Sequence, residues 1–156
     1  MKKGIAIAIV VCAMLPAVAF AQMDSYLEML RTDVRAEKVA VITEVMAFTD
    51  AESEVFWPIY REYELELAKI FDSRLANIKK YAENFETLDD VTADELIKTS
   101  FKVREKRAKL QKSYYSKFNK QLGAKRAARF MQLESQINLL IDLQIAANLP
   151  LIGEEY

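Results

Sequence analysis

The sequence contains no histidine, and its single cysteine, Cys12, lies in an apolar N-terminal segment. A chain that loses this segment has no thiolate and no imidazole. This excludes disulfide bonds, Ser–His–Asp and Cys–His catalysis, and zinc sites built from Cys or His. Three glycines are also too few to suggest a glycine-rich phosphate-binding loop. We therefore predict that the protein is not an enzyme and that it uses no cofactor and no metal.

Glycine and proline are both scarce, with three residues of each among 156. Sheets joined by tight turns need many more of them, so this composition favours long helices with few breaks. No stretch shows the alternation of apolar and polar residues that is typical of a half-buried strand. The length fits one domain. We predict an all-α fold of about four helices, two of them long, in a hairpin-like bundle.

The N-terminus has the three parts of a secretory signal peptide. Lys2 and Lys3 form its charged start, an apolar run follows, and Ala19-Phe20-Ala21 is a small-x-small cleavage site. We expect residues 1–21 to be removed, which leaves 22–156 as a single helical domain. The mature protein is then periplasmic and has no stable membrane span.

The segment allows two other interpretations, both of which the residues disfavour. An uncleaved membrane anchor is disfavoured because the apolar run is short for a span and a good cleavage site follows it. A lipoprotein modified at Cys12 is disfavoured because Val10 and Val11 stand where small residues are expected.

Hydrophobic periodicity predicts helices over about 23–46, 50–85, 93–121 and 124–147, with breaks at Ala47-Phe48 and at Gly123. The predicted apolar face of the first helix consists of Leu27, Leu30, Val34, Val41 and Val45, and its charged residues, Lys38 included, are expected on the solvated side. The predicted apolar face of the fourth consists of Ala127, Phe130, Met131, Ile137, Leu140, Ile141 and Ile145.

Two helix starts carry the pattern of a capping box, in which a side-chain hydroxyl and a glutamate satisfy each other's backbone amides. The first is Thr49-x-x-Glu52, preceded by Phe48 as a candidate hydrophobic staple. The second is Thr92-x-x-Glu95, which is expected to open the third helix.

The charge is unevenly distributed, although the whole chain has a formal net charge of −1. Residues 96–129 contain twelve Lys or Arg and one acid, Glu105, a local net charge of +11. Apolar residues are threaded through this stretch at spacings of 7, 7, 4 and 4, which places them on one helical face. They are Leu96, Val103, Leu110, Tyr114 and Phe118.

This basic stretch allows three interpretations. It can pair with the acidic second helix in an antiparallel bundle, it can bind unfolded or anionic polypeptides, or it can bind nucleic acid or anionic lipid. Export argues against nucleic acid. For polypeptide binding, the candidate residues are Lys102, Arg104, Arg107, Lys109, Lys112, Tyr114 and Tyr115.

Three acidic residues of the second helix, Glu62, Glu64 and Glu66, raise the question of a carboxylate metal site. Residues i and i+2 do not share a helix face, so only Glu62 and Glu66 could act together. A solvated acidic face that pairs with the basic helix is the simpler interpretation.

With these helix starts, the chain resembles the Spy/CpxP family of periplasmic helical proteins, whose members carry Leu-Thr-x-x-Gln helix starts. The first such motif stands here as Phe48-Thr49-Asp50-Ala51-Glu52 and the second as Leu122-Gly123-Ala124-Lys125-Arg126. Both depart from the pattern, with Phe for Leu and Glu for Gln in the first, and Gly for Thr and Arg for Gln in the second. The blocks Phe56-Trp57-Pro58-Ile59-Tyr60 and Phe130-Met131-Gln132-Leu133-Glu134 suggest a separate branch of related exported helical proteins.

The resemblance implies a four-helix protomer that forms a thin, curved antiparallel homodimer and holds unfolded clients on a basic concave face without ATP. The leading hypothesis is therefore an ATP-independent chaperone-like protein that binds unfolded or partly folded envelope proteins. The alternative is an envelope-stress regulator that docks on one sensor-kinase periplasmic domain. The family also has zinc-responsive members, which the lack of His and Cys argues against here. A trimeric chaperone of the Skp type is disfavoured by the sequence pI near 5.7 and by the missing strands.

Overall fold

A computed structural model describes residues 37–153, all of whose regular elements are helices. Residues 37–46 form a helix, α2 spans Asp50–Asn84, α3 spans Asp90–Leu122 and α4 spans Ala124–Ala146. A short 3-10 helix, η1 (Phe85–Thr87), joins α2 to α3. No strand occurs among residues 37–153, and the all-α prediction is confirmed. The predicted signal peptide, Leu27, Leu30 and Val34 lie outside the described residues.

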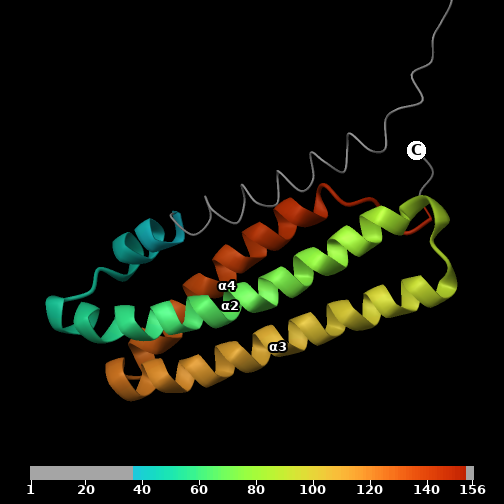
Figure 1. Cartoon of the computed structure of the whole chain (residues 1–156). Helices are drawn as coiled ribbons and strands as arrows, with labels where there is room; N and C mark the ends of the chain where they lie inside the picture. Colours follow the sequence, from blue (N-terminus) through green and yellow to red (C-terminus); the bar gives the residue numbers. More distant parts are fainter. Residues whose placement is uncertain (1–36, 154–156) are drawn as a thin grey trace, which may run out of the picture.

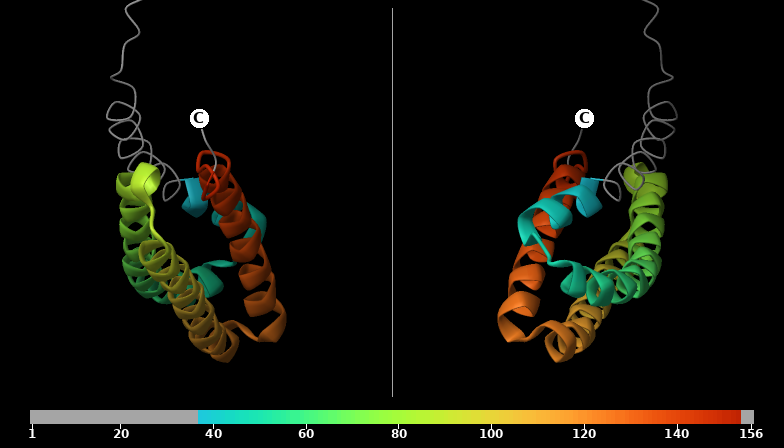
Figure 2. Two further views of the ribbon diagram at one scale, coloured as in Figure 1. Left: turned by 90° about the vertical axis from the view of Figure 1, so that its right-hand side faces the viewer. Right: turned by 90° about the vertical axis from the view of Figure 1, so that its left-hand side faces the viewer.

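The helices α2 and α3 form a long antiparallel hairpin, and α4 returns along α3 (Figure 1). Gly123 makes the sharp turn from α3 into α4 at a φ of 81°, a backbone conformation that glycine adopts without steric cost. Viewed end-on, α2 and α4 stand apart (Figure 2). They meet through long side chains, while α3 packs along both.

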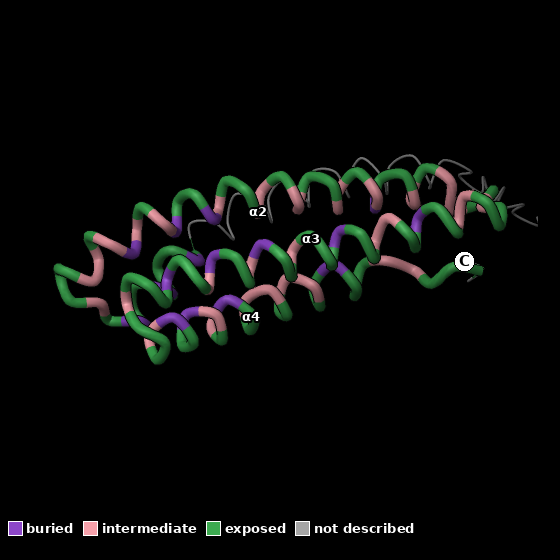
Figure 3. The backbone as a smooth tube through the Cα atoms, turned by 90° about the horizontal axis from the view of Figure 1, so that it is seen from below, coloured by how far each residue is buried: buried purple, intermediate pink, exposed green. Residues whose placement is uncertain are grey.

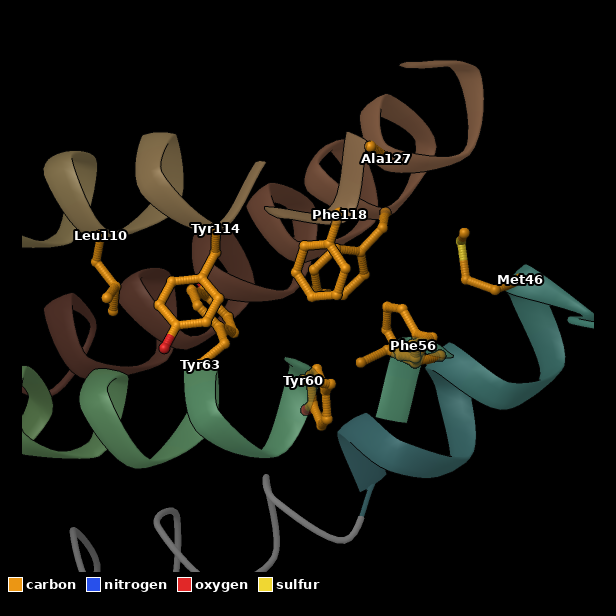
Figure 4. Packing of buried hydrophobic residues seen from close by; sticks show 10 residues of the cluster. Met46, Phe56, Tyr60, Tyr63, Leu110, Tyr114, Phe118 and Ala127 are labelled. Carbon is orange, nitrogen blue, oxygen red and sulfur yellow. The ribbon is translucent and has the colours of Figure 1, made fainter. Parts of the chain in front are cut away.

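The main core lies where the helix 37–46, the start of α2, the end of α3 and the start of α4 meet (Figure 4). It is rich in aromatic rings. The ring of Phe56 contacts those of Phe118 and Phe130, at centroid distances of 5.1 and 5.0 Å. A smaller cluster around Ile78 and Ile145 lies nearer the η1 end of the bundle. All five apolar residues predicted on the buried face of the third helix are buried there, so that prediction is confirmed.

The predicted apolar face of the first helix is wrong where the structure describes it. Val41 and Val45 are each 39% exposed, whereas Ile42 and Met46 are 0% and 1% exposed. Lys38, expected on the solvated side, is 4% exposed. The buried line therefore runs through residues 38, 42 and 46, since this side faces α2 and α4.

The capping box at Thr49 and Glu52 is confirmed at the start of α2. The Thr49 hydroxyl accepts from the Glu52 amide at 3.3 Å, and the Glu52 carboxylate accepts from the Thr49 amide at 2.9 Å. The Phe48 ring packs 4.3 Å from that of Phe56, between centroids. The second predicted cap is wrong: α3 begins three residues earlier than expected, and Asp89 accepts from the Thr92 amide at 2.8 Å. Asp89 is itself a favourable N-cap residue, and it lies one turn before the predicted cap. The helix that it caps is therefore longer at this end.

Removing the observed cap of α3 is expected to cost more than removing the predicted one. Asp89→Ala should lower the free energy of unfolding by about 1 kcal/mol, the usual loss for an N-cap carboxylate. Thr92→Ala is the matched control and should cost less than about 0.5 kcal/mol. Urea denaturation followed by circular dichroism measures both. Equal losses for the two variants would contradict the assignment of Asp89 as the cap.

Candidate functional site

The sequence predicted a positively charged surface on the third helix, and α3 exposes several of these cations. We call Lys98, Lys102, Arg104, Lys109 and Lys112 the basic face of α3; all five side chains are exposed. They lie away from the buried line of the helix, which runs through Leu96, Val103 and Leu110. Figure 3 shows buried and exposed residues alternating along α3, as expected for a helix with one buried side.

The ion pairs of the basic face are few and local. Lys98 pairs with Asp94 and Lys109 with Glu105, each four residues away on α3 itself. Exposed i,i+4 pairs are weak and are screened by salt. Lys102, Arg104 and Lys112 form no ion pair with another residue of 37–153. Much of the positive charge of this face therefore stays available to a ligand.

Charge pairing between α2 and α3, the first interpretation of the basic stretch, is present but limited. Lys117 of α3 contacts Glu62 of α2 at 3.2 Å. In the second pair the cation comes from α2, where Lys80 contacts Glu95 of α3 at 2.6 Å. Neither pair includes a member of the basic face. Within the described residues, neutralisation by α2 accounts for little of the charge on α3.

Arg107, a predicted binding residue, points into the bundle instead of away from it. Its Nη1 and Nη2 atoms lie 3.2 and 2.9 Å from the two carboxylate oxygens of Asp142 on α4, and Arg74 of α2 contacts the same carboxylate. Burial acts to raise the pKa of Asp142, but the hydrogen bonds and charges of the two arginines outweigh it and lower that pKa. Asp142 thus stays ionised and joins three helices.

The two predicted tyrosines are part of the packing. Tyr114 is 2% exposed, its ring lies 5.3 Å from that of Tyr63, and its hydroxyl donates to Glu66 at 2.6 Å. Burial raises the pKa of the Tyr114 hydroxyl, and the hydrogen bond to Glu66 adds to the rise. Tyr115 is half-buried against the main core. Tyr114 therefore has no ring surface left for a ligand, whereas Tyr115 keeps part of its surface exposed.

The exposed aromatic residue on α3 is Phe101, which sequence reasoning missed. Its side chain is 57% exposed, and Ile97, one turn earlier, is 46% exposed. The signal was present in the sequence: both residues lie off the line of Leu96 and Val103, so a helix that buries that line leaves them outside. Phe101 adjoins Lys102 and lies one turn from Arg104, which gives the basic face an apolar component.

The three glutamates considered for a metal site have separate partners. Glu62 pairs with Lys117, Glu66 accepts from Tyr114, and Glu64 accepts from Lys38 at 2.6 Å. Among residues 37–153, no group of three or more acidic residues could hold a metal ion.

Lys38 belongs to a buried polar cluster that joins three helices, and this cluster was not predicted. Its ammonium lies 2.6 Å from Glu64 of α2 and 3.0 Å from Glu134 of α4. The same Glu134 oxygen accepts from Tyr63 at 3.0 Å and from Asn138 at 2.9 Å. Burial raises the pKa of the Tyr63 hydroxyl, and the charge of Glu134 raises it further, so this phenol remains a donor.

Arg126, in the second helix-start motif, connects the start of α4 to the first turn of α2. Its Nε and Nη2 atoms each lie 2.8 Å from a carboxylate oxygen of Glu52, and its Nη1 atom donates to the carbonyl of Met46 at 2.9 Å. The hydrogen bond from Arg126 lowers the pKa of Glu52. Leu122 of the same motif is half-buried against the main core. The two motifs that carry the family resemblance therefore meet in space and join the start of α4 to the start of α2.

Comparisons with known proteins add no assignment: no family model, no curated protein and no solved structure matches the chain. Between residues 37 and 153, no helix is long and apolar enough to cross a membrane.

Proposed function

We propose that the protein is a periplasmic, ATP-independent chaperone-like protein that binds unfolded or partly folded polypeptides on the basic face of α3. One observation carries the proposal. Lys102, Arg104 and Lys112 are exposed without an ion pair among residues 37–153, and the exposed side chain of Phe101 lies on the same helix, three residues before Arg104. The resemblance to the Spy/CpxP family agrees with this function.

The physical basis is a combination of long-range charge and short-range apolar contact. Unpaired cations attract segments that carry Asp and Glu, and they raise the rate of encounter more than the final affinity. Phe101 and Ile97 then supply apolar surface for a client that has not buried its own hydrophobic residues. Such binding is weak per contact and tolerates many sequences, as a protein that holds clients without ATP requires.

The test is suppression of aggregation of a chemically unfolded client, followed by light scattering with purified 22–156. Wild-type protein should suppress aggregation at low salt and do so several-fold less well at about 0.5 M salt, where the screening length falls to a few ångströms. The triple variant Lys102→Glu, Arg104→Glu, Lys112→Glu should lose most of the activity even at low salt.

A matched control separates the location of the charges from the net charge. The triple variant Arg61→Glu, Lys69→Glu, Lys125→Glu changes the net charge by the same amount at exposed positions outside α3. It should keep most of the activity. Equal losses in the two triple variants, or no effect of salt, would overturn the basic face as the binding surface. Saturable binding to one sensor domain without suppression of aggregation would support the regulatory alternative.

A further inference from the structure

The smaller apolar cluster, between the second halves of α2 and α4, is only partly covered by the described residues. Two of its residues are buried, Ile78 and Ile145, whereas four remain half-buried: Phe71, Leu75, Ile141 and Leu149. The main core, by contrast, has ten buried residues. Leu140, which was predicted on the buried face of this helix, is 62% exposed. Among residues 37–153, the second half of the bundle therefore has less apolar cover than the first.

The helix 37–46 supplies this cover in the first half. Its side chains Ile42 and Met46 are buried in the main core, and Lys38 pairs with Glu64 of α2 and Glu134 of α4. Figure 1 shows this helix beside the first part of α2, while α2 continues well beyond it. The described part of the helix therefore ends before the smaller cluster begins.

The contacts of the helix 37–46 indicate where the preceding residues would run. Arg126 donates to the carbonyl of Met46, and Lys38 pairs with Glu134, so eight residues back along this helix correspond to eight residues forward along α4. The two helices are thus antiparallel. Because all α-helices rise by about 1.5 Å per residue, a continued helix would bring residue 30 level with Asp142 and residue 26 level with Ala146. Residues 26–36 are therefore long enough to reach the end of α4.

The sequence before residue 37 carries the side chains that such a continuation needs. The buried line of the helix, at positions 38, 42 and 46, continues backward at the same interval of four through Val34, Leu30 and Tyr26. Residues four apart form one ridge on the surface of a helix, and such ridges pack against neighbouring helices. Glu28 and Asp33 fall on other sides of the same helix. The continued helix would therefore be amphipathic, with its apolar ridge in line with the buried one.

We propose that residues 22–36 of the same chain continue the first helix and cover the smaller cluster with this ridge. Leu30 then lies beside Ile141, and Val34 lies one turn nearer to Lys38. The segment is attached directly to the helix 37–46, so it reaches the cluster without the concentration cost that a separate chain meets. This cover leaves the basic face of α3 as the exposed surface for clients, but it does not depend on client binding.

Disulfide formation tests this arrangement, because residues 22–156 contain no cysteine. In the double variant Leu30→Cys with Ile141→Cys the two thiols face each other. They should form an intramolecular disulfide within minutes under mild oxidation, which maleimide labelling detects as a loss of free thiol. Leu30→Cys with Leu139→Cys is the matched control, since Leu139 is 68% exposed and residues two apart do not share a helix face. It should react at least about ten-fold more slowly, because a disulfide needs Cα atoms within about 7 Å.

A second cysteine pair allows for a small shift in register between the two helices. A continued helix brings Val34 level with Asn138, so Val34→Cys with Ile137→Cys should also form its disulfide faster than the control. Either fast pair would place the segment along this side of α4. If neither pair reacts faster than the control, the proposal is overturned.

Thermal unfolding tests whether the ridge is buried. Leu30→Asp with Val34→Asp places two carboxylates against apolar side chains and should lower the melting temperature by at least about 5 °C. It should also raise several-fold the fluorescence of a dye that binds exposed apolar surface. Met29→Asp with Ala36→Asp is the matched control, because it adds the same charge to the same segment away from the ridge. It should shift the melting temperature by less than about 2 °C, and equal shifts would contradict the proposal.

Other occupants of the smaller cluster would give different results. A protein of twice the chain mass in light scattering, in which neither cysteine pair reacts quickly, would assign the cluster to a second copy. A Leu30→Asp with Val34→Asp variant that keeps its melting temperature but loses suppression of aggregation would assign the segment to client binding. Either result would overturn the proposal. Disulfide formation and the aggregation assay can fail independently, so a failure of the proposed function would be recognised separately.

Discussion

Replacing Lys38 by methionine is expected to destabilise the protein by about 3–5 kcal/mol, the usual result of removing one partner from a buried ion pair. Lys38 is 4% exposed and Glu134 is 0% exposed. Without the ammonium, Glu134 keeps hydrogen bonds from Tyr63 and Asn138 but loses the only cation in contact with it among residues 37–153. Its second carboxylate oxygen already has no hydrogen-bond partner there. The uncompensated charge accounts for most of the expected loss.

A double-mutant cycle separates this effect from lost packing. Urea denaturation of Lys38→Met, Glu134→Gln and the double variant should show that the double variant loses less than the sum of the single losses, by about 1–3 kcal/mol. Lys102→Met, at an exposed position without an ion pair to any described residue, is the control and should change stability by less than about 0.5 kcal/mol. A loss below about 1 kcal/mol for Lys38→Met would contradict the buried cluster.

The second large effect is expected for Phe130→Ala, which should cost about 3–5 kcal/mol. The ring of Phe130 is 0% exposed and lies 4.8 Å from Phe118 of α3 and 5.0 Å from Phe56 of α2, between centroids. Since α4 meets α2 through side chains, removing this ring leaves a cavity at the point where all three helices join.

Phe101→Ala is the matched control, because the same side chain is removed from a position that is 57% exposed. It should change the free energy of unfolding by less than about 0.5 kcal/mol. Thermal and urea unfolding measure both variants. If Phe130→Ala and Phe101→Ala were equally stable, the aromatic cluster would not be the main source of packing energy.

The sequence predicted those parts of the fold that depend on neighbours along the chain. The helix breaks at Ala47-Phe48 and Gly123 and the cap at Thr49 arise within one helical turn, so local composition suffices to find them. The buried line of α3 was also predictable, because a helix of 33 residues repeats its apolar pattern over many turns.

Predictions failed where the partner of a residue lies far away in the sequence. Lys38 was predicted to be a surface residue because its partners, Glu64 and Glu134, lie 26 and 96 positions later in the sequence. The contact of Arg107 with Asp142 of α4 could not be predicted for the same reason, since the two residues are 35 positions apart. In the first helix both the line of Ile42 and the neighbouring line of Val41 contain apolar residues, so periodicity alone does not decide which of them is buried.

The sequence by itself determined the all-α class, the breaks at Ala47-Phe48 and Gly123, and the concentration of positive charge in α3, because propensity, capping and charge content are local properties. Only the tertiary structure decided which cations of α3 have no ion pair among residues 37–153, that Arg107 contacts Asp142, and that Leu140 lies outside the core. Burial depends on which helices pack together and at what rotation, and those are set by the whole set of contacts at once.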